Sequence, residues 1–195
     1  MDRITLKNQA KEQIKGKIGI LFVISLIIGL IEGVIGLLNF LPGVGIVVTI
    51  IVTPAFALSL SRIYLGLTAS ITPTVGDAFS GFNDFWSSFK VTFLTGLLCF
   101  LWSLLLIVPG IIKAYSYSMA PYILAENKGM SARECLRRSK EMTNGHKMDL
   151  FVLRLSFIGW ALLCAVTLGI ASIWVIPYVQ TTMANAYNSL KRGEM

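Results

Sequence analysis

One pattern of residues occurs three times along this chain. In each copy a basic segment leads into a long apolar stretch, a short turn follows, and a second apolar stretch continues through an internal proline. Because two apolar stretches joined by a tight turn pack as a helical hairpin, the chain is predicted to form three hairpins. The turns are Pro42-Gly43, Pro109-Gly110 and Thr167–Gly169, and the internal prolines are Pro54, Pro121 and Pro177. The pseudo-repeats lie at about residues 1–67, 68–127 and 128–195 of one domain.

Composition indicates the solvent of these hairpins. Hydrophobic residues make up 55% of the 195 residues, and charged residues only 14%. A soluble chain of this length cannot hide so much apolar surface in its core. We therefore predict an all-α, polytopic helical bundle embedded in a membrane.

A membrane-spanning helix needs ~20 mostly apolar residues. The fourth apolar stretch is brief and begins directly after Pro109-Gly110, so the third and fourth stretches form either two crossings or a re-entrant hairpin. We favour six crossings. The predicted spans are Ile18–Leu38, Val44–Leu67, Val91–Val108, Ile111–Leu124, Leu150–Val166 and Gly169–Tyr187.

Positive charge predicts orientation, because Lys and Arg concentrate in cytoplasmic loops beside span ends. Basic residues precede the first predicted span, lie between the fourth and fifth, and follow the sixth, whereas the three turns carry no charge. We expect a multi-pass plasma-membrane protein with both termini in the cytoplasm. The net charge of +7 then faces an anionic leaflet. Nucleic-acid binding is not indicated, because no recognition motif accompanies the charge.

The segment Ser131–Asn144 is predicted to be an amphipathic helix outside the spans. Ser131 and Glu134 have the spacing of a capping box, and Asn144-Gly145 supplies a stop. Two pairs have the spacing of ion pairs on its surface, namely Glu134 with Arg138 and Arg137 with Glu141.

Two further segments share this amphipathic character. Aromatic residues recur at helical spacing over Phe79–Phe89, and a thin apolar line runs beside lysines in the N-terminal segment. We expect all three segments to be interfacial helices that set the depth of the hairpins. The alternative is a docking surface for a partner protein or a lipid headgroup.

Several stretches resemble those of a known family. They are the run Phe100–Leu124 and the motifs Phe79–Phe82, Gly145–Lys147, Ser156–Trp160 and Trp174–Tyr178. The resemblance is to a family of small integral membrane proteins of Gram-positive bacteria, catalogued as a domain of unknown function. It covers nearly the whole chain and implies the fold and a bacterial plasma membrane, but no catalytic residues. More remotely, the hairpins are similar to membrane regions fused to glycerophosphodiester phosphodiesterases.

The residue types needed for catalysis are not grouped in this sequence. The single histidine, His146, lies in a predicted turn, and Ser103 and Ser116 lie in apolar stretches without a base beside them. There is no glycine-rich phosphate loop, no metal-ligand spacing and no paired cysteine spacing. We expect a noncatalytic protein that uses no cofactor and no metal.

Charged residues in or beside the predicted spans are the candidate functional residues. Glu32 and Lys113 are expected in the outer half of the membrane, where pairing lowers the cost of an isolated charge. A proton or substrate site is the alternative for these two. The candidates for binding anionic lipid or a protein partner are Arg62, Arg133, Arg137, Lys140 and Arg154.

Two functions are compatible with these residues. We favour an accessory or interaction protein that presents its basic helices to a protein partner, to a second copy or to anionic lipid. The alternative is a small transporter or lipid-handling protein with a pathway around Glu32, Lys113 and the proline kinks. A polar cavity that reaches Glu32 favours transport, whereas a wide apolar groove favours interaction.

Overall fold

The computed structural model describes residues 3–37 and 44–193, so the predicted turn Pro42-Gly43 lies outside the described residues. Within these ranges all regular structure is helical. The elements in chain order are α1 (Arg3–Ile14), α2 (Ile18–Leu37), α3 (Val44–Thr68), the 3₁₀ helix η2 (Val75–Asp84), α4 (Phe85–Leu105), α5 (Ile107–Tyr117), α6 (Ala120–Glu126), α7 (Ala132–Met142), α8 (Lys147–Leu155), α9 (Ile158–Val166) and α10 (Ser172–Arg192).

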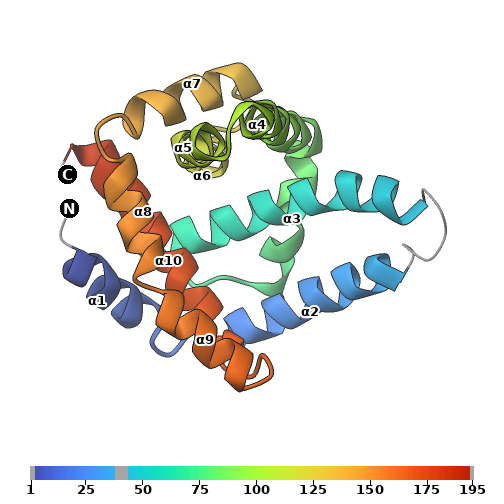
Figure 1. Ribbon diagram of the computed structural model, residues 1–195. Helices are drawn as coiled ribbons and strands as arrows, with labels where there is room; N and C mark the ends of the chain where they lie inside the picture. Colours follow the sequence, from blue (N-terminus) through green and yellow to red (C-terminus); the bar gives the residue numbers. More distant parts are fainter. Residues whose placement is uncertain (1–2, 38–43, 194–195) are drawn as a thin grey trace.

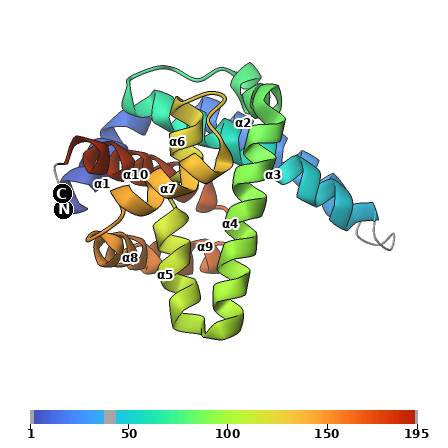
Figure 2. The same ribbon diagram turned by 90° about the horizontal axis from the view of Figure 1, so that it is seen from above.

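Three sets of helices leave a common base in different directions (Figure 1, Figure 2). α2 and α3 run side by side toward the right in both views, whereas α4 and α5 are seen end-on in Figure 1 and point downward in Figure 2. We call α2 with α3 up to Thr53 the first arm, α4 with α5 the second arm, and α8, α9 and α10 up to Ile176 the third arm. The base consists of α1, the rest of α3, α6, α7 and the rest of α10.

Burial differs sharply between the arms and the base. The buried residues of α3, apart from Gly45, all lie from Pro54 onward, and residues 181–187 of α10 are buried without interruption. In α9, by contrast, no residue is buried. At the tip of the third arm Val166 is 80% exposed and Leu168 is 94% exposed. The arms therefore present apolar surface of the kind that lipid covers.

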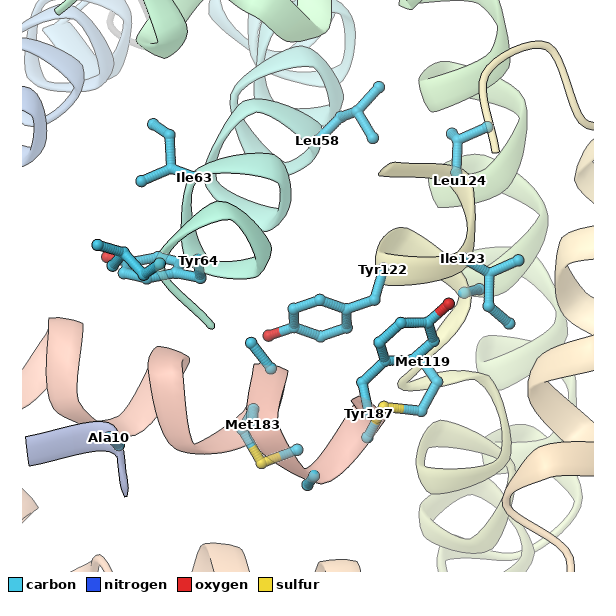
Figure 3. Packing of buried hydrophobic residues seen from close by; sticks show 14 of the residues in the cluster. Ala10, Leu58, Ile63, Tyr64, Met119, Tyr122, Ile123, Leu124, Met183 and Tyr187 are labelled. Atoms are coloured by element: carbon cyan, nitrogen blue, oxygen red, sulfur yellow. The ribbon is translucent and has the colours of Figure 1, made fainter. Parts of the chain in front are cut away.

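The core of the base forms where α3, α6 and α10 meet (Figure 3). The rings of Tyr122 and Tyr187 stack with centroids 5.8 Å apart, and Tyr64 from α3 is 2% exposed. The hydroxyl of Tyr187 donates to Oε2 of Glu126 at 2.7 Å, which satisfies its polar end. Three helices that are far apart in the sequence thus share one core.

The internal prolines lie where arm and base join. Pro54 and Pro177 are buried inside α3 and α10, close to the start of the buried part of each helix. Pro121 differs, because it lies in the first turn of α6, where a missing N–H costs no hydrogen bond. This proline begins a short helix and does not kink a long one.

The second predicted turn is displaced. The chain reverses at Leu106, which has extended dihedral angles, and Pro109-Gly110 belongs to the first turn of α5. A proline is accepted there because the first N–H groups of a helix have no intrahelical partner. Gly110 then packs against α4, since a Cβ at this position would lie 2.9 Å from Cα of Ser103. The third turn is confirmed, because Leu168 and Gly169 adopt φ values of 50° and 90°.

Two of the predicted spans are interrupted. The stretch Ile111–Leu124 breaks between α5 and α6, and the stretch Leu150–Val166 breaks at Ser156-Phe157 between α8 and α9. By length and composition, four stretches of the described residues are able to cross a membrane: Ile18–Leu37, Val44–Thr68, Val75–Leu104 and Lys147–Val166.

Candidate functional site

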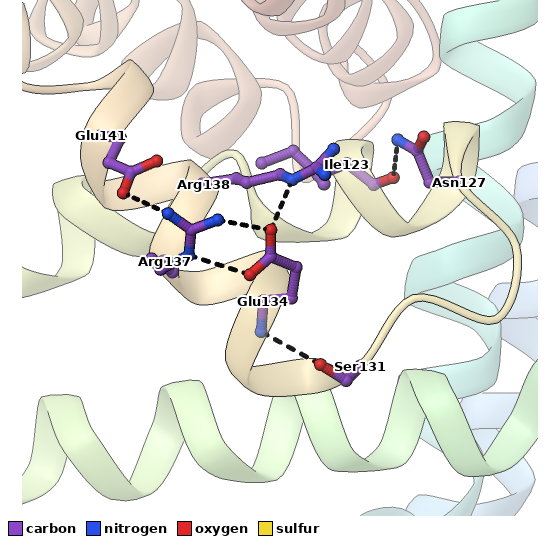
Figure 4. Close-up of polar contacts among 7 residues, drawn as sticks. All are labelled: Ile123, Asn127, Ser131, Glu134, Arg137, Arg138 and Glu141. Atoms are coloured by element: carbon purple, nitrogen blue, oxygen red, sulfur yellow. Dashed lines mark hydrogen bonds and ion pairs between the residues drawn. The ribbon is translucent and has the colours of Figure 1, made fainter.

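α7 carries the densest charge of the described structure, and its local design follows the predicted pattern. Ser131 caps the helix by accepting the N–H of Glu134, and Gly145 follows its end with a φ of 87°. The carboxylate of Glu134 pairs with Arg137 at 2.7 Å and with Arg138 at 2.8 Å, and Arg137 also pairs with Glu141 at 2.8 Å (Figure 4). Hydrogen bonds from the two arginines lower the pKa of Glu134 to about 2. Both predicted ion pairs are confirmed.

The apolar face of α7 packs on protein and does not lie on lipid. Cys135 and Ser139 are fully buried. Oγ of Ser139 donates to the carbonyl of Ser116 at 2.8 Å and accepts the N–H of Met119 at 3.2 Å. These bonds satisfy main-chain groups at the break between α5 and α6. This face of α7 therefore packs against the break between α5 and α6, which corrects the expected interfacial contact with lipid. Arg133, Arg137 and Lys140 remain on the exposed side of the helix.

α1 is attached to the base in the same way. Its buried residues are Leu6, Ala10 and Ile14, and the helix packs along α10. Its lysines reach aromatic rings of the third arm and of α10. Nζ of Lys7 lies 4.4 Å from the ring centroid of Phe157, and Nζ of Lys11 lies 5.7 Å from that of Tyr178. Burial, with the nearby positive charges of α1, lowers the pKa of Lys7.

Arg62 lies in a cleft of the base that also has Glu126 and Lys191 in its walls. The cleft has a volume of 610 Å³, and a second hollow of 270 Å³ shares Arg62, Gly66 and Ile71 with it. The Arg62 guanidinium pairs with Asp84 at 2.5 Å and donates to the carbonyl of Ser80 at 2.6 Å. Its charge is thus already compensated by a carboxylate of the chain.

Another cation in this cleft is compensated as well. Lys191, at the end of α10, pairs with Glu126 at the end of α6. Burial acts to raise the pKa of Glu126, but the hydrogen bonds from Lys191 and Tyr187 outweigh it and hold this pKa below its usual value. Lys191 and Glu126 therefore join two helix ends and hold the base together.

Apolar grooves run between the arms. One of 440 Å³ lies between α3 and α4, with Ile50, Phe93 and Phe100 in its walls. A groove of 470 Å³ lies between α5 and α8, and another of 440 Å³ lies where α8 and α9 meet α10. Grooves of this kind are the feature that favours interaction over transport.

Glu32 and Lys113 lie on different arms of the described structure. Glu32 is exposed on α2, and Nζ of Lys113 on α5 lies 4.5 Å from the ring centroid of Trp102. The ion pairs formed by the described residues do not join these two side chains. Neither residue lines any of the five cavities described above.

Arg154 lies in the wall of the groove that α8 and α9 form with α10. Its guanidinium carbon is 5.6 Å from the ring centroid of Tyr115. No carboxylate of the described residues pairs with Arg154. An arginine of this kind retains its capacity to bind an external anion.

A family model described as "Protein of unknown function (DUF975)" matches residues 1–116 and 104–194. The chain belongs to this family. No curated protein and no solved structure matches the chain. The family description assigns no activity.

In the structure of this DUF975 chain, the predicted cations differ in whether a carboxylate pairs with them. Arg62 and Arg137 are paired with carboxylates, whereas Arg133, Lys140 and Arg154 form no ion pair among the described residues. Only Arg154 also lines an apolar groove. The sequence pattern was not used to identify Tyr115 and Phe151, which line the groove beside Arg154, or Lys147, which lines the groove between α5 and α8. The signal was present, because Lys147, Phe151 and Arg154 have the i, i+4, i+7 spacing of one helix face.

Proposed function

We propose that this chain is a noncatalytic, multi-pass protein of the bacterial plasma membrane that binds anionic phospholipid in an accessory role. The division of the molecule into apolar arms and a charged base is the observation that supports this proposal. Large apolar side chains are exposed along α2, α4, α5 and α9. Exposed surface of this extent is stable in hydrocarbon and is a liability in water.

The proposed topology keeps six crossings in three hairpins, with both termini and the base at the cytoplasmic face. Because spanning helices tilt by about 20° on average, this topology requires the first and second arms, which leave the base in different directions (Figure 1, Figure 2), to lie closer to parallel in the bilayer. The basic residues of α1 and α7 support this orientation, because they lie on the base. The fourth crossing is supported least. α5 has 11 residues and measures about 16 Å, about half of the ~30 Å hydrocarbon core. A re-entrant second arm is the alternative.

Anionic lipid is the proposed partner because cations without an internal counter-ion lie beside apolar grooves. Each basic side chain near an anionic leaflet contributes about 1 kcal/mol of attraction, which salt weakens. A transport pathway through Glu32 and Lys113 has less support, since these residues share no cavity described here.

The test is native mass spectrometry of the full chain in mild detergent, titrated with phosphatidylglycerol and with phosphatidylcholine of identical acyl chains. We expect tighter binding of the anionic lipid, with a preference that shrinks as salt rises. Equal binding of both lipids at every salt concentration would overturn the proposal. Co-purification of a stoichiometric protein in place of lipid would assign the basic surface to a protein partner.

A further inference from the structure

We propose that the crease between the second and third arms is a binding site for one anionic diacyl glycerophospholipid, with its phosphate on Arg154 and its acyl chains in the two grooves beside Tyr115 and Phe151. This inference rests on the proposed function and names the site and the ligand class.

Two apolar grooves share one aromatic wall. The rings of Tyr115 and Phe151 meet edge to face, with centroids 5.8 Å apart, and both residues line both grooves. The groove toward α5 and the start of α8 has a volume of 470 Å³, and the groove toward α9 and α10 has 440 Å³. Both volumes are within the range of small-molecule pockets. Two similar channels on either side of one wall suit two chains that leave one glycerol.

Arg154 is positioned to receive the phosphate. The guanidinium carbon of Arg154 lies 5.6 Å from the ring centroid of Tyr115, and the guanidinium donates none of the side-chain hydrogen bonds of the described residues. The planar fork of a guanidinium matches the geometry of a phosphate group. Arg154 is exposed at the groove toward α9 and α10 and has no carboxylate of the described residues as a counter-ion. A ligand that brings a negative charge therefore meets an uncompensated cation here.

A second cation belongs to the same face of α8. Lys147 lines the first groove, seven residues before Arg154, which corresponds to about 10 Å along the helix. Lys147 forms none of the ion pairs of the described residues. The positive charge therefore extends along the crease and favours an anionic over a zwitterionic headgroup.

A lipid fits the crease better than a peptide does. A polypeptide in hydrocarbon must satisfy every N–H and C=O group internally, whereas an acyl chain carries no polar group to satisfy. The walls of the first groove are almost wholly apolar, with Val108, Ile111 and Met148 among them. The crease thus combines two apolar grooves with an unpaired cation, and an anionic phospholipid has both the acyl chains and the negative charge that complement them.

The test compares three variants of the full chain in the same native mass spectrometry titration. Arg154→Gln removes the phosphate contact, and Ile111→Trp fills the first groove without changing charge. Arg133→Gln is the matched control, because Arg133 is an exposed arginine of α7 that lines neither groove. We expect Arg154→Gln to weaken phosphatidylglycerol binding about tenfold or more and Arg133→Gln to change it less than twofold. Ile111→Trp should weaken binding severalfold with Arg154 intact.

The outcomes separate the two proposals. If the wild-type chain prefers phosphatidylglycerol but Arg154→Gln binds it as tightly as Arg133→Gln, the site is wrong and the proposed function stands. If the wild-type chain shows no anionic preference, the proposed function itself fails. Competition by glycerol 1-phosphate at lipid concentrations would show that the site takes a soluble phosphate and no acyl chains, and would overturn the lipid assignment. Should Arg154→Gln not fold, Ile111→Trp decides, because unchanged lipid binding in it excludes the grooves.

Discussion

Arg62 and Asp84 join the base part of α3 to the end of η2, directly before the second arm. Nη2 of Arg62 in α3 lies 2.5 Å from Oδ2 of Asp84 at the end of η2, and their side chains are only 14% and 23% exposed. The same guanidinium binds the carbonyl of Ser80, so a single side chain holds η2 against α3 at two points.

Arg62→Met should destabilise the fold. A mostly buried, charge-assisted pair is lost, and Asp84 is left without its counter-ion, so we expect a loss of about 1.5–3 kcal/mol. Chemical unfolding in mild detergent measures it. Arg133→Met, which removes an exposed arginine, is the control and should change stability by less than ~0.5 kcal/mol. Equal stability of the two variants would argue that the pair contributes little.

Gly81→Ala should separate η2 from α3. A Cβ at Gly81 would collide with the carbonyl oxygen of Ala55 and lie 2.9 Å from its carbonyl carbon. Because backbone cannot yield as a side chain can, we expect a cost of about 1–3 kcal/mol or more. Gly76→Ala is the matched control in the same helix, since its Cβ would approach nothing nearer than Oγ1 of Thr74 at 3.8 Å. Equal melting temperatures for both variants would contradict this packing.

Cys135 should react slowly with thiol reagents in the folded protein. The side chain is fully buried, and burial raises the pKa of its thiol to about 11. A rise of this size reduces the thiolate on the order of a hundredfold. Labelling kinetics before and after unfolding, with Cys99 and Cys164 replaced by Ala, measure the difference. Rapid labelling of the folded chain would mean that the face of α7 that carries Cys135 is not packed against the neighbouring helices.

The proposed orientation needs an exposed probe in place of Cys135. In a chain whose three cysteines are replaced by Ala, Arg133→Cys puts a thiol on the outer face of α7. A membrane-impermeant reagent should label it only after the cells are opened, since the densest positive charge is expected in the cytoplasm. Labelling in intact cells would reverse the topology.

The ion pairs of α7 should give stability that depends on pH. The folded pKa of Glu134 is about 2, against an ordinary value of 4.5. The contribution of Glu134 is therefore complete above about pH 4.5 and is lost as pH falls toward 2. The difference in melting temperature between the wild-type chain and Glu134→Gln should shrink over that window. Glu12→Gln, at an exposed glutamate of α1, should show no comparable change, and a constant difference for Glu134→Gln would exclude the linkage.

Changes at Glu32 and Lys113 should be additive. Lys113 contacts Trp102, and Glu32 is exposed on another arm, so neither side chain depends on the other. Melting temperatures of Glu32→Gln, Lys113→Met and the double variant provide the measurement. Recovery of stability in the double variant would restore the pair that the sequence suggested.

Local rules were sufficient for part of this structure. The cap at Ser131, the pairs of Glu134 and Arg137, and the reversal at Leu168 and Gly169 each depend on residues within four positions of one another. Neighbours that close meet in any context that forms the helix or turn. Composition likewise indicated a membrane protein, because composition is a property of the sequence that depends on no contact between residues.

Tertiary contacts decided what each face touches. The apolar line through Leu6 and Ala10 has the same spacing whether it meets lipid or protein, and only the position of α10 shows that it meets protein. Pro109-Gly110 suits a turn or the first turn of a helix equally well, and the close packing of Gly110 on Ser103 selected the helix.

The fates of the arginines show the same division. The sequence by itself indicated that Arg62 and Arg154 lie near the cytoplasmic ends of apolar stretches, where an arginine snorkels or binds an anionic headgroup. Only the fold decided that Asp84, 22 positions from Arg62, neutralises one of them, while Arg154 meets Tyr115 and no carboxylate of the described chain. Charge pairing between distant segments depends on which helices pack together, and packing is a property of the whole chain that no local pattern contains.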